Sequence, residues 1–130
     1  MSMSARSEVV AKEILMVDKK LIETLIDDLE MADIRCQVLR ALGNPIRLRI
    51  MASLCVSGES SVGEIRETLG LAQATISQQL ASLRLHGLVK ARKDGGFRRY
   101  SVALPPIADL MTCLARCHRD HAEERHAPGD

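Results

Sequence analysis

The 130 residues are 46% hydrophobic but only 2% aromatic, which predicts one domain with a modest core of aliphatic side chains. The formal net charge of +1 points to no partner by itself, and no apolar stretch reaches the length of a membrane span. Because the N-terminus lacks a charged-then-apolar signal pattern, we expect a cytoplasmic protein that does not bind membranes. In that compartment four cysteines do not imply a disulfide framework.

Apolar periodicity predicts the helices of the first half. A helix capped by Ser7 is expected to run to about Glu30, and a further helical stretch runs from Met31 to Leu42 and ends at Gly43. Asn44-Pro45 then begins a helix, because Asn is a favoured cap and Pro is tolerated at the first helical position. The apolar composition of this helix, which ends at Ser57-Gly58, predicts that it is the buried centre of the fold.

Two short helices joined by a tight turn follow. Ser61 and Glu64 have the spacing of a capping box, which predicts a helix up to Leu69, and Gly70 makes the turn. The second helix is expected from about Gln73 to His86, although Ala72 stands at its cap position and cannot accept the usual hydrogen bond. Its predicted buried side chains are Ile76, Leu80, Leu83 and Leu85.

A basic hairpin and a last helix complete the predicted elements. Residues 88–93 and 97–102 read as strands around Asp94-Gly95-Gly96, and Pro105-Pro106 begins the last helix. From Gln73 to Tyr100 the bases outnumber the acids, whereas in the first 33 residues the acids outnumber the bases. The predicted fold class is therefore mainly α with a small β-hairpin, a winged helix-turn-helix.

The second of the two short helices has the composition of a DNA-reading helix. In a helix-turn-helix this helix lies in the major groove, where Gln matches the adenine edge and Ser or Thr can serve a base or a phosphate. Arginine and lysine supply the phosphate contacts that dominate affinity. The candidate DNA-binding residues are Gln73, Thr75, Ser77, Gln78, Gln79, Ser82, Arg84, Lys93, Arg98 and Arg99.

With these motifs the chain resembles the ArsR family of winged-helix repressors. The matching residues lie at 39–50, 61–65, 74–80, Leu83 and 87–100, in the expected order and spacing. The resemblance implies a homodimer that binds a palindromic operator in double-stranded DNA, dimerises through its N- and C-terminal helices, and is released by an inducer.

Four segments follow from this interpretation. Residues 1–32 are expected to form an N-terminal dimerisation helix, and residues 33–103 the DNA-binding core. Residues 104–126 are expected to form a C-terminal helix at the dimer interface that also carries the sensor, and residues 127–130 a disordered tail.

The sequence indicates the site at which an inducer would act less clearly than it indicates the DNA-binding residues. Family members often bind metals through cysteines before the first helix of the helix-turn-helix, but the matching positions here are Ser61 and Gly63. The positions that match a zinc site on the last helix of other members begin with Leu104 and Pro106, which cannot ligate.

Cys113 and Cys117 remain, one helical turn apart on one face. They could hold a soft metal or metalloid ion as a cofactor, or react with an oxidant or reactive sulfur species. Cys36, Cys55, His118 and His121 are the further candidates for this site. The alternative is that these cysteines pack as small hydrophobic residues.

Two other classes of function fit the sequence less well. No Ser/His/Asp set, phosphate-cradling glycine loop or paired carboxylate cleft is recognisable, so the chain is not expected to be an enzyme. A winged-helix protein–protein interaction module without inducer sensing is the alternative to a repressor. It predicts little salt dependence and no operator binding, and the basic hairpin argues against it.

Overall fold

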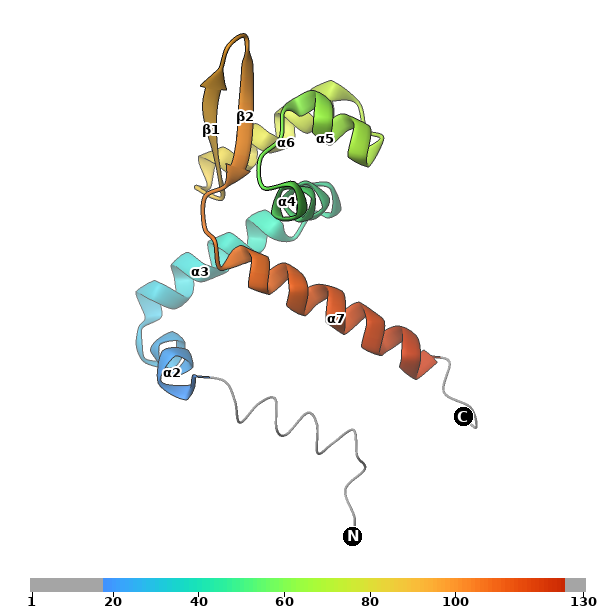
Figure 1. Ribbon diagram of the computed structural model, residues 1–130. Coiled ribbons are helices and arrows are strands. Elements are labelled where there is room, and N and C mark those ends of the chain that lie inside the picture. The colour runs from blue at the N-terminus through green and yellow to red at the C-terminus, as the bar shows by residue number, and fades with distance from the viewer. Residues whose placement is uncertain (1–17, 126–130) are drawn as a thin grey trace. The chain divides into compact units, whose positions relative to one another are not determined.

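A computed structural model describes residues 18–125, with the side chains of residues 18–117 (Figure 1). The elements are α2 (Lys19–Asp27), α3 (Leu29–Leu42), α4 (Pro45–Ser57), α5 (Val62–Leu69), α6 (Gln73–Leu85), β1 (Val89–Asp94), β2 (Phe97–Val102) and α7 (Ile107–Arg125). Within this described part, no helix is both long enough and apolar enough to cross a bilayer. The contacts divide the chain into two units after Cys36.

The first unit contains α2 and the beginning of α3. The Asp18 carboxylate accepts a hydrogen bond from the backbone N–H of Leu21 at 3.0 Å, and Asp28 does the same for Met31 at 3.0 Å. The predicted uninterrupted helix from Ser7 to Glu30 is therefore wrong where the structure describes it. Aspartate side chains that bond nearby backbone N–H groups favour helix starts over helix interiors. Residues 7–17 of that prediction lie outside the described residues.

The second unit is built around α4. Asn44 caps this helix by accepting hydrogen bonds from the backbone N–H groups of Ile46 and Arg47, at 2.9 and 3.1 Å, as the sequence predicted. Fully buried aliphatic side chains from α4, α5, α6 and the start of the hairpin form the core, to which α3 and α7 add their adjoining ends. They are Ile50, Met51, Leu54, Ile65, Ile76, Leu80, Leu83 and Leu88. This packing holds α5 and α6 in the arrangement of the predicted helix-turn-helix.

The caps of α5 and α6 agree with the sequence prediction. The Ser61 hydroxyl accepts a hydrogen bond from the backbone N–H of Glu64 at 3.2 Å. Gly70 then ends α5 at a φ of +68°, a left-handed conformation that glycine adopts without strain. Ala72 precedes α6 and provides no side-chain cap.

The sequence prediction that Leu85 is buried is wrong. Its side chain is 85% exposed, whereas Ile76, Leu80 and Leu83 are fully buried. The reason is helical geometry: two residues beyond Leu83 is a rotation of about 200°, which places Leu85 on the face opposite the core.

The hairpin is antiparallel and leaves one face for the core. Paired residues share a face, so Val89↔Val102, Ala91↔Tyr100 and Lys93↔Arg98 point one way, and Arg92↔Arg99 points the other. The β2 strand also pairs through Tyr100 with Ser60, whose N–H and C=O bond it at 3.0 and 2.8 Å. In Figure 1 the hairpin stands beside α5 and α6.

Candidate nucleic-acid interface

The outer face of α6 is a stripe of two alanines, a glutamine and a leucine. Ala74, Gln78, Ala81 and Leu85 recur at steps of four, three and four residues, and all are exposed. This stripe lies opposite the buried side chains of Ile76 and Leu83. Two alanines in such a stripe let a helix backbone approach a surface closely, while Gln78 offers a donor and an acceptor between them.

The other polar residues of α6 flank this stripe. Gln73 and Ser77 are exposed, whereas Thr75 and Ser82 are half-buried. The core packing described above thus leaves the predicted polar contacts of the first three turns at or near the solvent side of α6.

Gln79 lies differently. It is half-buried, and its side-chain oxygen accepts a hydrogen bond from Arg47 Nη1 at 3.1 Å. Arg47 Nε in turn donates to the backbone carbonyl of Ala41. Gln79 therefore ties α6 to α4 in this structure, and its side-chain oxygen is engaged inside the protein. The sequence held no sign of this, because Arg47 is 32 residues away.

The predicted phosphate-binding cations fall into two groups. Arg84, Lys93 and Arg98 are exposed. Lys93 and Arg98 are directly opposite each other across the hairpin, a like-charge pair that costs stability. Within the described side chains, no carboxylate lies at ion-pair distance from either residue. Among the side chains that the structure describes, neither Lys93 nor Arg98 is therefore held in an ion pair.

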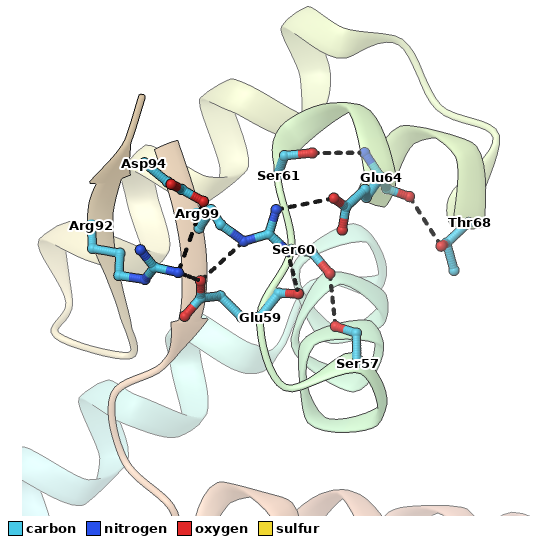
Figure 2. A network of polar contacts seen from close by, with 9 residues as sticks. All are labelled: Ser57, Glu59, Ser60, Ser61, Glu64, Thr68, Arg92, Asp94 and Arg99. Atoms are coloured by element: carbon cyan, nitrogen blue, oxygen red, sulfur yellow. Dashed lines mark hydrogen bonds and ion pairs between the residues drawn. The ribbon is translucent and has the colours of Figure 1, made fainter. Parts of the chain in front are cut away.

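Arg99 forms the second group, because carboxylates and a backbone carbonyl of the same chain bind its guanidinium (Figure 2). Its Nε donates to Glu59 Oε1 at 3.0 Å and its Nη1 to Glu64 Oε1 at 3.1 Å. A third hydrogen bond joins Nη2 to the backbone carbonyl of Glu59 at 3.3 Å. Arg99 thus bridges β2 to the segment before α5 and to α5 itself, and only 26% of its side chain is exposed.

Glu59 is the centre of this network. It also pairs with Arg92 Nη2 at 2.6 Å, so one carboxylate faces both arginines of a cross-strand pair. The hydrogen bond from Arg92, more than that from Arg99, lowers the pKa of Glu59. The pKa of Arg92 is raised in return by Glu59, and that of Arg99 mainly by Glu64. We name Glu59, Glu64, Arg92 and Arg99 the wing clamp.

Sequence reasoning missed the carboxylates of the wing clamp. Glu64 was expected to complete a capping box with Ser61, but its side chain accepts from Arg99 instead. Glu59 and Glu64 precede Arg99 by 40 and 35 residues, so no local spacing could have shown the contact.

The candidate sensor residues are spread over three helices. Cys36 lies exposed on α3, Cys55 is half-buried on α4, and Cys113 and Cys117 are exposed on α7. Burial raises the pKa of Cys55, which disfavours its reactive thiolate. Among the described side chains, no three His, Cys, Asp or Glu residues gather as a metal site. The side chains of His118 and His121 lie outside that part.

Comparison with known proteins places this geometry in a family. Residues 44–91 match the model of the bacterial regulatory proteins of the arsR family. The HTH-type transcriptional regulator Rv0081 of Mycobacterium tuberculosis is 40% identical over 79 residues, which are 60% of this chain and 68% of that protein.

Solved structures agree. The homodimeric winged helix-turn-helix DNA-binding domain of Mb0332 from Mycobacterium bovis has a TM-score of 0.65 at 31% identity, over 78% of this chain and 93% of that one. The transcriptional repressor BigR from Xylella fastidiosa has a TM-score of 0.61 at 32% identity, over 78% and 96% of the two chains. The predicted fold class and the prediction that the chain is not an enzyme are confirmed by these relatives, which are DNA-binding regulators. The protein belongs to the ArsR family of winged helix-turn-helix transcriptional regulators.

Proposed function

We propose that this regulator is a repressor that binds double-stranded operator DNA with α6 in the major groove. The observation that carries the proposal is the outer stripe of α6, in which Gln78 stands between two alanines beside the exposed cations of the hairpin. The repressor role is proposed by analogy with BigR, a structural relative that is a transcriptional repressor.

The proposed contacts divide by chemistry. Gln73 and Gln78 read base edges, and Thr75, Ser77 and Ser82 contact bases or phosphates. Arg84, Lys93 and Arg98 contact phosphates. For Gln79 and Arg99 the internal hydrogen bonds support another role: Gln79 orients α6 on α4, and Arg99 orients the hairpin on α5.

A homodimer is part of the proposal. The helix α2 has no buried residue, and its Leu21, Ile22, Leu25 and Ile26 are all exposed, as expected of a face that a second chain covers. We assign dimerisation to residues 1–32 and 104–126, and DNA binding to residues 33–103. Two half-sites of a palindrome then lie about 34 to 36 Å apart, one helical turn of DNA. A chain that sediments as a monomer at micromolar concentration would contradict this assignment.

For release from the operator we propose an inducer that acts on Cys113 and Cys117. Both are exposed and one turn apart on α7, which suits a soft metal or metalloid ion, or a thiol-reactive species, reaching them from solvent. Because both half-sites must be engaged together, a small change in subunit spacing would weaken binding.

The DNA-binding proposal is tested by fluorescence anisotropy with a labelled duplex from upstream of the protein's own gene. The double variant Gln73→Ala/Gln78→Ala should lose affinity for this duplex by about 30-fold or more for each bound protomer, at roughly 1 to 3 kcal/mol for each of the two base contacts, but bind a scrambled duplex as before. Gln37→Ala, which removes an exposed glutamine of α3, is the matched control. Equal losses on both duplexes would contradict base reading, and a chain that ignored both at low salt would be an interaction module.

The sensor proposal has its own test. Cys113→Ser/Cys117→Ser should bind the operator like the wild type but no longer dissociate when arsenite, cadmium, peroxide or a persulfide donor is added. Cys36→Ser is the control and should respond normally. A double variant that is still fully released would exclude these two thiols as the sensor.

A further inference from the structure

Arg47 joins three helices of the second unit. Its side chain is half-buried near the start of α4, where its backbone N–H donates to the Asn44 cap at 3.1 Å. From there Nε donates a hydrogen bond to the backbone carbonyl of Ala41 on α3, and Nη1 donates to Gln79 Oε1 on α6 at 3.1 Å. One guanidinium therefore links the last turn of α3 to the helix that is proposed to read DNA.

The bond to Ala41 replaces a helical hydrogen bond that the sequence does not allow. Ala41 lies in the last turn of α3, where a continuing helix would bond its carbonyl to the N–H four residues later. That residue is Pro45, which has no N–H. Ala41 is only 3% exposed, so a carbonyl without a partner would cost free energy there. The guanidinium supplies the missing donor, and its positive charge suits the C-terminal end of α3.

The bond to Gln79 restrains the rotation of α6 about its own axis. A guanidinium only donates hydrogen bonds, so the atom of Gln79 that faces it is the oxygen. The core side chains of α6, Ile76 and Leu80 among them, are fully buried, but the stabilisation from their burial depends on area rather than on direction. A hydrogen bond depends on both distance and angle. Arg47 therefore restrains the orientation of α6 more sharply than the apolar contacts do.

This orientation matters because Gln78 is the neighbour of Gln79. Successive helix residues are about 100° apart, so the position of Gln79 determines where Gln78 points from the outer stripe. A side-chain amide about 6 Å from the helix axis moves about 1 Å when the helix rotates by about 10°. Such a displacement weakens a bidentate bond to a base edge, whereas contacts to phosphates carry no sequence information. A loosened α6 would therefore lose sequence selectivity more than general affinity.

We propose that Arg47 is a positioning residue for base recognition, an inference that rests on the proposed DNA binding. By holding Gln79 to the last turn of α3, Arg47 fixes the rotation at which Gln73 and Gln78 meet the bases. In this role Arg47 does not contact the nucleic acid and acts through Gln79 alone. The rotation of the DNA-reading helix then follows the position of the end of α3.

The test measures operator selectivity, which is the ratio of the Kd for a scrambled duplex to the Kd for an operator found by selection from random DNA. Arg47→Leu and Gln79→Met each remove one end of the bond and should each lower this ratio about tenfold for each bound protomer. The slope of log K against log salt concentration should not change, because no phosphate contact is lost. Arg40→Leu, which removes an exposed arginine from the last turn of α3, is the matched control and should keep full selectivity.

The double variant Arg47→Leu/Gln79→Met separates positioning from independent contacts with DNA. Because the two residues act through one bond, the double variant should lose no more selectivity than either single variant. Losses that multiply would show that each residue contacts DNA by itself. A flatter salt slope in Arg47→Leu would make this arginine a phosphate contact, and full selectivity in Gln79→Met would leave its bond without a role in recognition. Each of these three results overturns the proposal.

Gln79 variants keep the test decisive if Arg47→Leu does not fold, since they leave the Ala41 carbonyl bonded to Arg47. Gln79→Glu retains an oxygen that accepts from Arg47, so it should keep the selectivity that Gln79→Met loses, although its negative charge lowers the affinity for every duplex. Equal loss of selectivity in the two variants would contradict positioning by Arg47. If the wild type selects no operator from random DNA, the proposed function itself fails.

Discussion

Single residues decide which cations of the hairpin can face DNA. Arg98 and Arg99 are adjacent in the sequence and were expected to act alike, but they point to opposite faces of β2. Arg98 lines a groove beside α6, whereas Arg99 is held by Glu59 and Glu64. The strand period of two residues could have separated them, but the acidic partners could not be foreseen, because they come from a distant part of the chain.

The wing clamp predicts an acid-sensitive hairpin. Because the pKa of Glu59 is lowered in the folded state, its ion pairs stabilise the fold at neutral pH. That contribution is lost as the pH falls below the ordinary Glu value of 4.5 and through the lowered folded value. Thermal melts between pH 7 and pH 3 should show wild type more stable than Glu59→Gln at the neutral end, with the difference shrinking toward the acid end.

Glu67→Gln is the control for this experiment, since Glu67 is an exposed carboxylate of α5 outside the wing clamp. A stability difference between wild type and Glu59→Gln that stayed constant over this pH range would show that the carboxylate charge does not anchor the hairpin.

At the scale of elements, the local chemistry of caps and turns was readable from the sequence. Asn44, Ser61 and Gly70 mark helix ends in the sequence and do so in the structure, because a cap depends only on residues within one turn. The wrong prediction of one continuous helix up to Glu30 has another cause. Asp18 and Asp28 lie inside an apolar period that predicted one long helix, and their side chains start new helices instead.

The uncapped start of α6 predicts a stabilising substitution. Ala72 has an extended backbone, suited to an N-cap, but no side-chain acceptor. Ala72→Ser should raise the free energy of unfolding by about 1 kcal/mol, since its hydroxyl can accept a hydrogen bond from a free backbone N–H of the first turn. Urea denaturation measures this, and Ala74→Ser, inside the same helix, should give no gain. An unchanged free energy in Ala72→Ser would mean that the first turn is already satisfied.

At the scale of the whole molecule, the proposed dimer would bind its operator with two copies of α6 acting together. A single helix-turn-helix with a few base contacts binds weakly, and linking two of them raises the affinity by about 10²- to 10⁴-fold when the spacing fits. The sequence could indicate such a dimer only through family resemblance, because an exposed apolar face looks like a core face until the fold is known. The exposed apolar side chains of α2 are an example, because their sequence pattern alone does not distinguish a dimer face from a core face.

The central claim is that Gln78 in the outer stripe of α6 and the flanking Gln73 read bases, and the side-chain amide signals of these two glutamines report on this directly. In NMR spectra of the full ¹⁵N-labelled chain, an operator duplex found by selection from random DNA should shift the side-chain amide signals of Gln73 and Gln78 strongly. A scrambled duplex should not. The amide of Gln79, bonded to Arg47, should shift far less. If the operator binds and leaves the signals of Gln73 and Gln78 unchanged, the protein recognises its site through some other surface.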